Sequence, residues 1–472
     1  MTVPLWRWSA SELARAVRAR EIRSREAVES CLTRLQQVNP QINAVVDVLH
    51  DEALADADRA DVAALRGEPL GPLHGVPVTI KINVDYTGRP TTNGVAAFTD
   101  RIAPADSPPV ANWRKAGAII IGRTNVPAFS ARFFTDNALY GRTLNPSAPD
   151  RTPGGSSGGG AAAVATGIGA LAHGSDRAGS IRYPAYACGV FGLRPTVGRV
   201  PTFEPSTPTE PTMTTQLTRV QGLLARCIAD LRLGLTAMAA RDARDPCWVP
   251  APLGEAPPHQ PRRVALCNPP LSAKADDAVI AALGMAAQYL DAAGWEIEEL
   301  TPPHLEEAAQ LFFSLIRTEE KTETSRAIEE FGDEALRRAR ASTMACAVEM
   351  NFAGYVRALA RRATILREWQ LFFERHPLLL MPVSYRRPFP IDFDQRGDQA
   401  VAEMLSAHQP MLAVSTLGLS GLAVPTGLAD GVPVGVQLVA GRFQEELCLT
   451  AGAIIERNVA ALTPLDPVQP QT

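Results

Sequence analysis

One lysine and two serines, each near a glycine-containing motif, could together carry a proton without a histidine: Lys81, Ser156 and Ser180. The motifs are Gly-Pro-Leu-His-Gly-Val-Pro at 71–77, Gly-Gly-Ser-Ser-Gly-Gly at 154–159 and Gly-Ser-Asp-Arg-Ala-Gly-Ser-Ile-Arg at 174–182. A serine hydroxyl attacks well only when a base takes its proton, and a lysine can be that base only while its amine is neutral. The combination predicts a serine hydrolase that acts on amides.

Lys81 stands in an apolar stretch that predicts a buried strand. The apolar run at 76–80 precedes it and Ile82 follows it. A strand of this kind would bring the amine to the end of a buried sheet, where desolvation favours the neutral form. A single lysine is usually a surface residue, so the prediction depends on the two serines as well.

The glycine and serine run at 154–159 is followed by Ala-Ala-Ala-Val-Ala at 161–165. Alanine is the strongest helix former, so the glycines are expected to open a helix and not to form a flexible linker. The N–H groups at the start of that helix could then face a developing negative charge.

The run at 155–159 also fits Gly-x-Ser-x-Gly, the nucleophile elbow of α/β-hydrolases. That elbow requires a strand directly before the serine. Residues 145–153 contain three prolines, which excludes a buried strand there. The elbow interpretation is therefore rejected.

With these motifs in order, the chain resembles the amidase signature family, whose members hydrolyse amides through a Ser–Ser–Lys triad. The resemblance extends from the N-terminal helices to Gly-Val-Pro-Val-Gly-Val-Gln at 431–437, which is essentially the whole chain. It implies an α/β fold with a mixed central sheet and helices on both faces. No cofactor is implied.

The resemblance also assigns roles by position. Lys81 matches the family's base, Ser156 the bridging serine that follows a cis peptide bond, and Ser180 the nucleophile that forms an acyl-enzyme. The separations of 75 and 24 residues agree with the family pattern. The backbone N–H groups of the loop that ends at the nucleophile are implied to form the oxyanion hole; this loop is Arg177, Ala178, Gly179 and Ser180. Residues that would support the loop are Ser157, Asp176 and Arg182.

Three positions depart from the family pattern. Arg177 and Ala178 replace a glycine and a small residue, Ile82 replaces an acidic residue, and Ala128 replaces a glutamate. Alanine adopts a left-handed conformation poorly, so the loop is either in an ordinary backbone region or strained. The Arg177 side chain could enter the acyl pocket or turn outward to Asp176, and we favour the outward direction because an unpaired buried guanidinium is costly.

The triad does not determine which amide is cut. A small aryl or alkyl carboxylic amide is the expected substrate, and a urea or carbamate is equally compatible with the triad. Two other functions stay open: the glutaminase-type subunit of an amidotransferase complex, which would need partner chains, and a non-hydrolytic relative that binds or transfers acyl groups.

Composition favours a cytoplasmic enzyme with a large core. The net charge of −4 gives no footprint for nucleic acid, and no run of 18 apolar residues predicts a membrane span. The seven cysteines form no spacing framework and the seven histidines no metal motif. His74 is expected to make a hydrogen bond that locks its turn. A homodimer is compatible with these features.

The pattern along the chain predicts one continuous amidase domain in four parts. These are an N-terminal helical segment at 1–65, a core with the triad at 66–240, a Pro-rich connection at 241–263, and a second half at 264–472. Within the second half, residues 305–375 are expected to form two or three helices that shape the substrate pocket.

Overall fold

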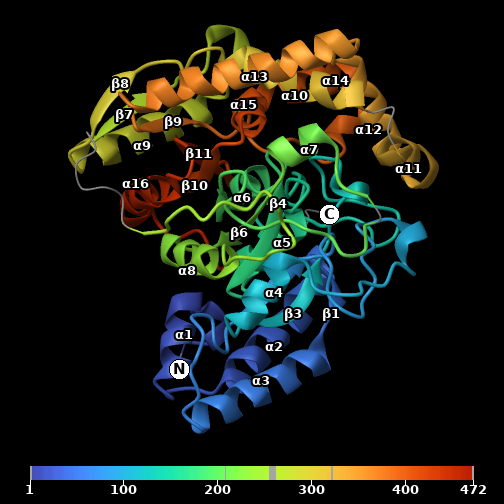
Figure 1. The fold of residues 1–472 in the computed structure, drawn as a ribbon. Coiled ribbons are helices and arrows are strands. Elements are labelled where there is room, and N and C mark those ends of the chain that lie inside the picture. Colours follow the sequence, from blue (N-terminus) through green and yellow to red (C-terminus); the bar gives the residue numbers. More distant parts are fainter. Residues whose placement is uncertain (1–2, 208, 255–261, 320–322, 470–472) are drawn as a thin grey trace.

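The computed structural model describes residues 3–207, 209–254, 262–319 and 323–469. Its centre is one 11-stranded mixed sheet in the order β1-β3-β2-β4-β6-β5-β10-β11-β9-β7-β8 (Figure 1). The strands are β1 (Val45–Val48), β2 (Pro77–Lys81), β3 (Ile119–Thr124), β4 (Leu171–Asp176), β5 (Phe191–Arg194), β6 (Val220–Ala225), β7 (Arg263–Leu266), β8 (Glu296–Glu299), β9 (Leu378–Pro382), β10 (Ser420–Ala429) and β11 (Val432–Ala440). Strand β2 runs parallel to both β3 and β4, and β7 runs parallel to β8 and β9. The other pairs in the sheet are antiparallel.

The helices of the described residues surround this sheet. They are α1 (Ala10–Arg18), α2 (Ser24–Ile42), α3 (His50–Leu65), α4 (Pro108–Lys115), α5 (Gly158–Thr166), α6 (Arg182–Cys188), α7 (Met213–Thr218), α8 (Ile228–Met238), α9 (Asp277–Ala292), α10 (Leu305–Glu319), α11 (Glu323–Phe331), α12 (Glu334–Ala345), α13 (Phe352–Phe373), α14 (Asp398–Ala407), α15 (Gln409–Leu417) and α16 (Glu445–Asn458). Figure 1 shows α1, α2 and α3 at one end of the molecule and α10, α13 and α14 at the other.

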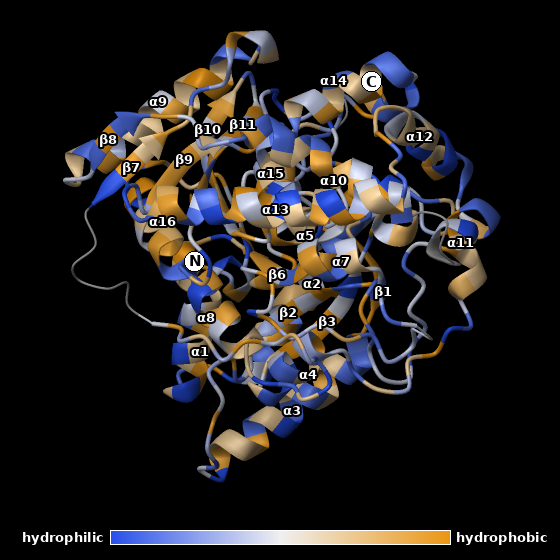
Figure 2. Cartoon of the chain, turned by 45° about the horizontal axis from the view of Figure 1, so that its top comes forward, coloured by the Kyte–Doolittle hydropathy of each residue, from blue (hydrophilic) through white to orange (hydrophobic). Residues whose placement is uncertain are grey.

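Side-chain alternation in β9 explains why both faces of the sheet are covered. Leu378 and Leu380 join the apolar cluster that includes α8, α9 and α16. Leu379 and Met381 join the cluster of α10, α13 and α15 on the opposite face. Successive strand residues point to opposite faces, so a continuous apolar strand requires helices on both sides. The hydrophobic colour of β9, β10 and β11 in Figure 2 reflects this double burial.

Most predicted elements are present, and two predictions need correction. The N-terminal helical segment also contains β1, which pairs antiparallel with β3. Residues 305–375 form four helices in the described part, α10 to α13, where we expected two or three. In the Pro-rich connection, residues 241–254 contain neither helix nor strand, and residues 255–261 lie outside the described residues.

The two predicted halves share the same sheet, because β5 of the first half pairs with β10 of the second. None of the helices among the described residues combines the length and apolarity that crossing a bilayer requires.

Candidate active site

Strand β2 ends on Lys81, whose side chain is fully buried beside two serine hydroxyls. Its Nζ lies 2.7 Å from Ser156 Oγ and 3.0 Å from Ser175 Oγ. Burial lowers the pKa of Lys81 to about 7, although the negative charge of Asp176 works in the opposite direction. The strand therefore delivers an amine that can be neutral near pH 7, hydrogen-bonded to the predicted bridging serine.

The backbone of Lys81 is held by a histidine that the sequence did not single out. Its N–H donates to His173 Nδ1 (3.3 Å), and the other ring nitrogen, Nε2, lies 2.9 Å from Gln221 Oε1. Burial lowers the pKa of His173 to about 3, so the ring is neutral. A neutral ring that accepts at Nδ1 must donate from Nε2, and this imidazole therefore holds β2 in place and is not available as a base.

Ser156 follows a cis peptide bond from Gly155. A Cβ atom on Gly155 would lie 2.4 Å from the carbonyl oxygen of Arg132, and one on Gly154 would lie 2.6 Å from Pro184 Cα. Gly154 also has a positive φ of 79°. The two glycines are needed because the loop passes between two other backbone segments.

The glycine run opens α5, as predicted. The N–H of Ser157 donates to the carbonyl oxygen of Ser180 (3.1 Å), and the N–H of Gly158 donates to Thr135 Oγ1 (3.1 Å). The prediction that the helix start faces a developing charge is wrong for these two N–H groups, because they hold neighbouring loops. The first of the two bonds places the nucleophile loop directly beside the serine loop.

The loop between β4 and α6 carries Ser180, which is partly exposed, and is organised by the buried Asp176. Asp176 Oδ1 accepts from the N–H of Gly179 (2.9 Å) and from Arg194 Nη1 (3.1 Å). Its Oδ2 accepts from Arg182 Nε (3.0 Å). Burial tends to raise the pKa of Asp176, but the charges of Arg182 and Arg194 hold it well below its usual range.

Arg182 connects this loop to the second half of the chain. Its guanidinium donates to Gln437 Oε1 (2.6 Å), Ser415 Oγ (2.7 Å) and the carbonyl oxygen of Met411 (3.1 Å). The resemblance had assigned Asp176 and Arg182 to this region, and the motif at 431–437 had included Gln437. Arg194 and Ser415 were missed, because neither lies in a recognisable motif.

The unusual residues of the loop adopt ordinary backbone conformations. Among the described residues with positive φ, this loop contributes only Gly179 (φ 110°), so Arg177 and Ala178 carry no left-handed strain. The N–H of Gly179, one of the four expected oxyanion donors, is bound to Asp176. Arg177 Nη1 donates to Thr215 Oγ1 (3.2 Å) on α7, whereas Asp176 pairs with Arg182 and Arg194.

The other two departures from the family pattern sit in apolar surroundings. Ile82 is buried directly after Lys81. Ala128 is buried in a small cluster with Phe98, Ile328 and Leu336, where a carboxylate would be unpaired. His74 Nε2 lies 2.9 Å from the carbonyl oxygen of Ala60, so its ring ties the turn at 71–77 to α3.

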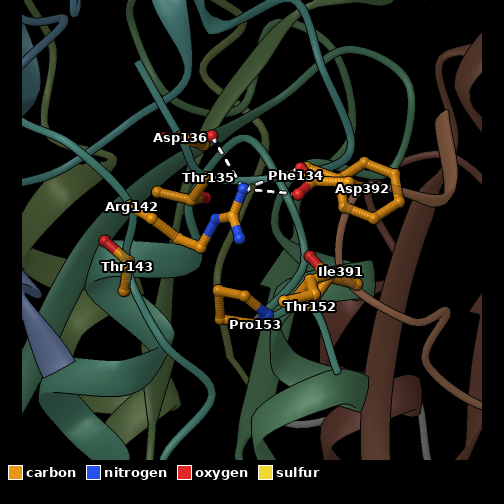
Figure 3. A pocket seen from close by; sticks show the side chains of 9 residues that line it. All are labelled: Phe134, Thr135, Asp136, Arg142, Thr143, Thr152, Pro153, Ile391 and Asp392. Carbon is orange, nitrogen blue, oxygen red and sulfur yellow. Dashed lines mark hydrogen bonds and ion pairs between the residues drawn. The ribbon is translucent and has the colours of Figure 1, made fainter. Parts of the chain in front are cut away.

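A small hollow lies beside the residues that lead into the serine loop. Figure 3 shows Arg142 at its wall, bound to Asp136 (3.2 Å) and Asp392 (2.7 Å). Thr152 and Pro153 line the side that leads to the loop. With about 10 Å³ this hollow holds a single water molecule at most, so it is not the place for an amide substrate.

The Amidase family model matches residues 26–449 of the chain. The chain belongs to the amidase signature family. It is 45% identical to an indoleacetamide hydrolase from Bradyrhizobium diazoefficiens, over 97% of this chain and 88% of the relative. It is 30% identical to a component of the glutamyl-tRNA(Gln) amidotransferase of Moorella thermoacetica, over 96% and 97%. These relatives show that this amidase is an amide-cleaving hydrolase.

A solved structure supports the same conclusion. A bacterial aryl acylamidase of the amidase signature family superimposes with a TM-score of 0.81 at 25% identity, covering 98% of each chain. The agreement over both halves of the chain confirms the expected amidase signature fold.

The turnover of this amidase is expected to rise with pH through about 7, because only neutral Lys81 can accept a proton and burial lowers its pKa to about 7. Below that pKa, kcat for a slow amide should increase about tenfold per pH unit and then level off. Measurement of kcat between about pH 5 and pH 9, with chemistry rate-limiting, tests this. A constant kcat over the whole range contradicts a lysine base.

Proposed function

We propose that this amidase hydrolyses a small primary amide with an aromatic acyl group, of the indole-3-acetamide type, through an acyl-enzyme on Ser180. The similarity to an indoleacetamide hydrolase over nearly the whole chain supports the substrate class. The 2.7 Å contact between Lys81 Nζ and Ser156 Oγ is the observation that carries the mechanism.

In the acylation step, Lys81 Nζ takes the proton of Ser156 while Ser156 Oγ takes the proton of Ser180. Ser180 Oγ then bonds to the carbonyl carbon, and the relay returns one proton to the amide nitrogen as the C–N bond breaks. Ammonia leaves. In the second step, water attacks the ester on Ser180 with the same relay as base, and the carboxylic acid is released.

Backbone N–H groups of the nucleophile loop stabilise the oxyanion in this proposal. Gly179 contributes least, because its N–H is already held by Asp176 Oδ1 at 2.9 Å. The N–H groups of Arg177, Ala178 and Ser180 are the remaining candidates. Asp176 shapes the loop that presents them, so it supports the oxyanion hole without touching the substrate.

Half-buried apolar side chains near the loop suit an aromatic acyl group. Phe133 packs against the cluster that contains Tyr183 and Met411, and its ring centroid is 6.1 Å from that of Tyr183. Ala178 and Phe313 pack against the cluster on the other side of the loop. Apolar and aromatic lining with few polar groups is typical of a pocket for an aromatic ligand.

The purified chain should hydrolyse indole-3-acetamide to indole-3-acetate and ammonia in equal amounts without any partner. Both products are quantified, with glutamine, a simple urea and an ester as competing substrates. The 30% identity to an amidotransferase component supports a second candidate, a glutaminase that works in a complex. Ammonia release from glutamine alone, and only with added partner chains, supports that candidate and contradicts ours.

A further inference from the structure

A chain of hydrogen bonds leads away from Lys81 on the side opposite Ser156. Ser175 Oγ lies 3.0 Å from Lys81 Nζ and accepts from Asn83 Nδ2 (3.2 Å). The same Asn83 Nδ2 donates to Ser130 Oγ (3.2 Å), and Ser130 Oγ donates to Asn93 Oδ1 (2.7 Å). Two loops distant in sequence are thus connected to the amine.

The donors and acceptors in this chain fix one another. Ser130 has one hydroxyl proton and gives it to Asn93, so it accepts from Asn83. Both N–H bonds of the Asn83 amide are then used, one toward Ser130 and one toward Ser175. The amide group is held at two points, and its second N–H holds the hydroxyl of Ser175.

The far end of the chain has an unusual backbone. Asn93, Phe129 and Ser130 all have positive φ, of 48°, 56° and 54°. The N–H of Phe129 donates to the carbonyl oxygen of Asn93 (2.9 Å), which joins the two loops. Non-glycine residues in this region cost free energy and persist only where their surroundings hold them. This backbone directs the Ser130 hydroxyl at Asn83.

A lysine base needs this kind of support because its side chain has four rotatable bonds. The neutral amine works only when its lone pair points at Ser156. The two serine oxygens, Ser156 Oγ and Ser175 Oγ, are the side-chain partners that bound its position in the described structure. Displacement of Ser175 would leave the amine free to turn away from the relay.

We infer that Asn93, Ser130 and Asn83 form a positioning chain that acts through Ser175 to hold the Lys81 amine against Ser156. This inference rests on the proposed role of Lys81 as the base. None of the three residues of the chain takes part in bond making in the proposed reaction.

The first test is Ser130→Gly, which removes the hydroxyl and leaves a residue that adopts a φ of 54° freely. We expect kcat for indole-3-acetamide to fall about tenfold, the effect of one lost hydrogen bond on an aligned base, with KM changed by less than about twofold. In combination with Ser175→Ala, the Ser130→Gly change should have little further effect, because both remove the same support.

The second readout is the pH profile. Ser175 Oγ accepts a hydrogen bond from the ammonium form, and loss of such a bond lowers the pKa of Lys81 further. The rise of kcat should therefore move to lower pH in both Ser130→Gly and Ser175→Ala. Asp176 and His173 are the other titratable groups beside Lys81, and they are unchanged in both variants.

A matched pair at Asn93 keeps the test decisive if Ser130→Gly folds poorly. Asn93→Asp retains the acceptor oxygen and tolerates positive φ, so kcat should stay within about twofold of the parent. Asn93→Gly retains the backbone conformation but loses the acceptor, so kcat should fall about tenfold.

Additive effects of Ser130→Gly and Ser175→Ala, or an unchanged pH profile in both, would overturn the positioning chain. So would equal kcat in Asn93→Asp and Asn93→Gly. If Lys81→Met retains activity, the proposed mechanism itself fails, and this outcome is distinct from a failure of the chain alone.

Discussion

Ser180→Ala is expected to lower amide turnover by at least about 10⁴-fold, because no other hydroxyl can accept the acyl group. A fluorophosphonate probe should label the parent at Ser180 and leave the variant unlabelled. The hydroxyl is partly exposed, so its removal should change the thermal midpoint of unfolding by no more than about 2 °C.

The informative control for this result is Ser157→Ala. Ser157 lies beside Ser156 in the same run, and its Oγ donates to the carbonyl oxygen of Ser175 (3.4 Å). Labelling should persist in that variant. Mass spectrometry that locates the probe on Ser156, Ser157 or any other serine would remove Ser180 from its role.

Lys81→Met should inactivate the enzyme and stabilise it at the same time. Methionine is similar in length but cannot accept a proton, so we expect kcat to fall by at least about 10³-fold. The pKa of Lys81 is lowered by burial from an ordinary value of 10.5 to about 7. Between these values the unfolded chain binds more protons than the folded chain, so stability rises with pH across this window.

The stability gain therefore depends on pH in a defined direction. Below about pH 7 the folded parent carries the full cost of a buried ammonium, and Lys81→Met should be more stable by about 1–3 kcal/mol, after the lost hydrogen bonds to Ser156 and Ser175 are deducted. The difference should shrink as the pH approaches 10.5. Urea unfolding of both proteins at several pH values measures it. A less stable variant at pH 6 contradicts the assignment of Lys81 as a strained base.

The motifs predicted the site well where neighbouring residues determine the structure. The apolar run before Lys81 and the alanines after Ser156 were sufficient to predict β2 and α5. Prolines at 145–153 excluded the competing elbow, and the described structure has no strand there. These features depend on side-chain periodicity and backbone propensity, which a sequence displays directly.

The residues that support the site could not be predicted in the same way. Arg194 reaches Asp176 because β5 and β4 both pair with β6, and Asn83 reaches Ser175 because β2 and β4 run side by side. Such contacts depend on strand order, which no local pattern contains. The N–H groups at the start of α5 were misjudged for the same reason: their partners, Ser180 and Thr135, come from other loops.

The long reach of Arg182 also sets when the enzyme can become active during its own synthesis. Arg182 is separated from Gln437, its 2.6 Å partner, by 255 residues. A ribosome that adds about 5–20 residues per second needs roughly 13–50 s to cross that interval. Throughout that time the nascent chain already holds Lys81, Ser156 and Ser180 but lacks the far-end partners of the arginine behind the nucleophile. Hydrolysis therefore begins only after β11 has emerged, and the first half of the polypeptide is silent on its own.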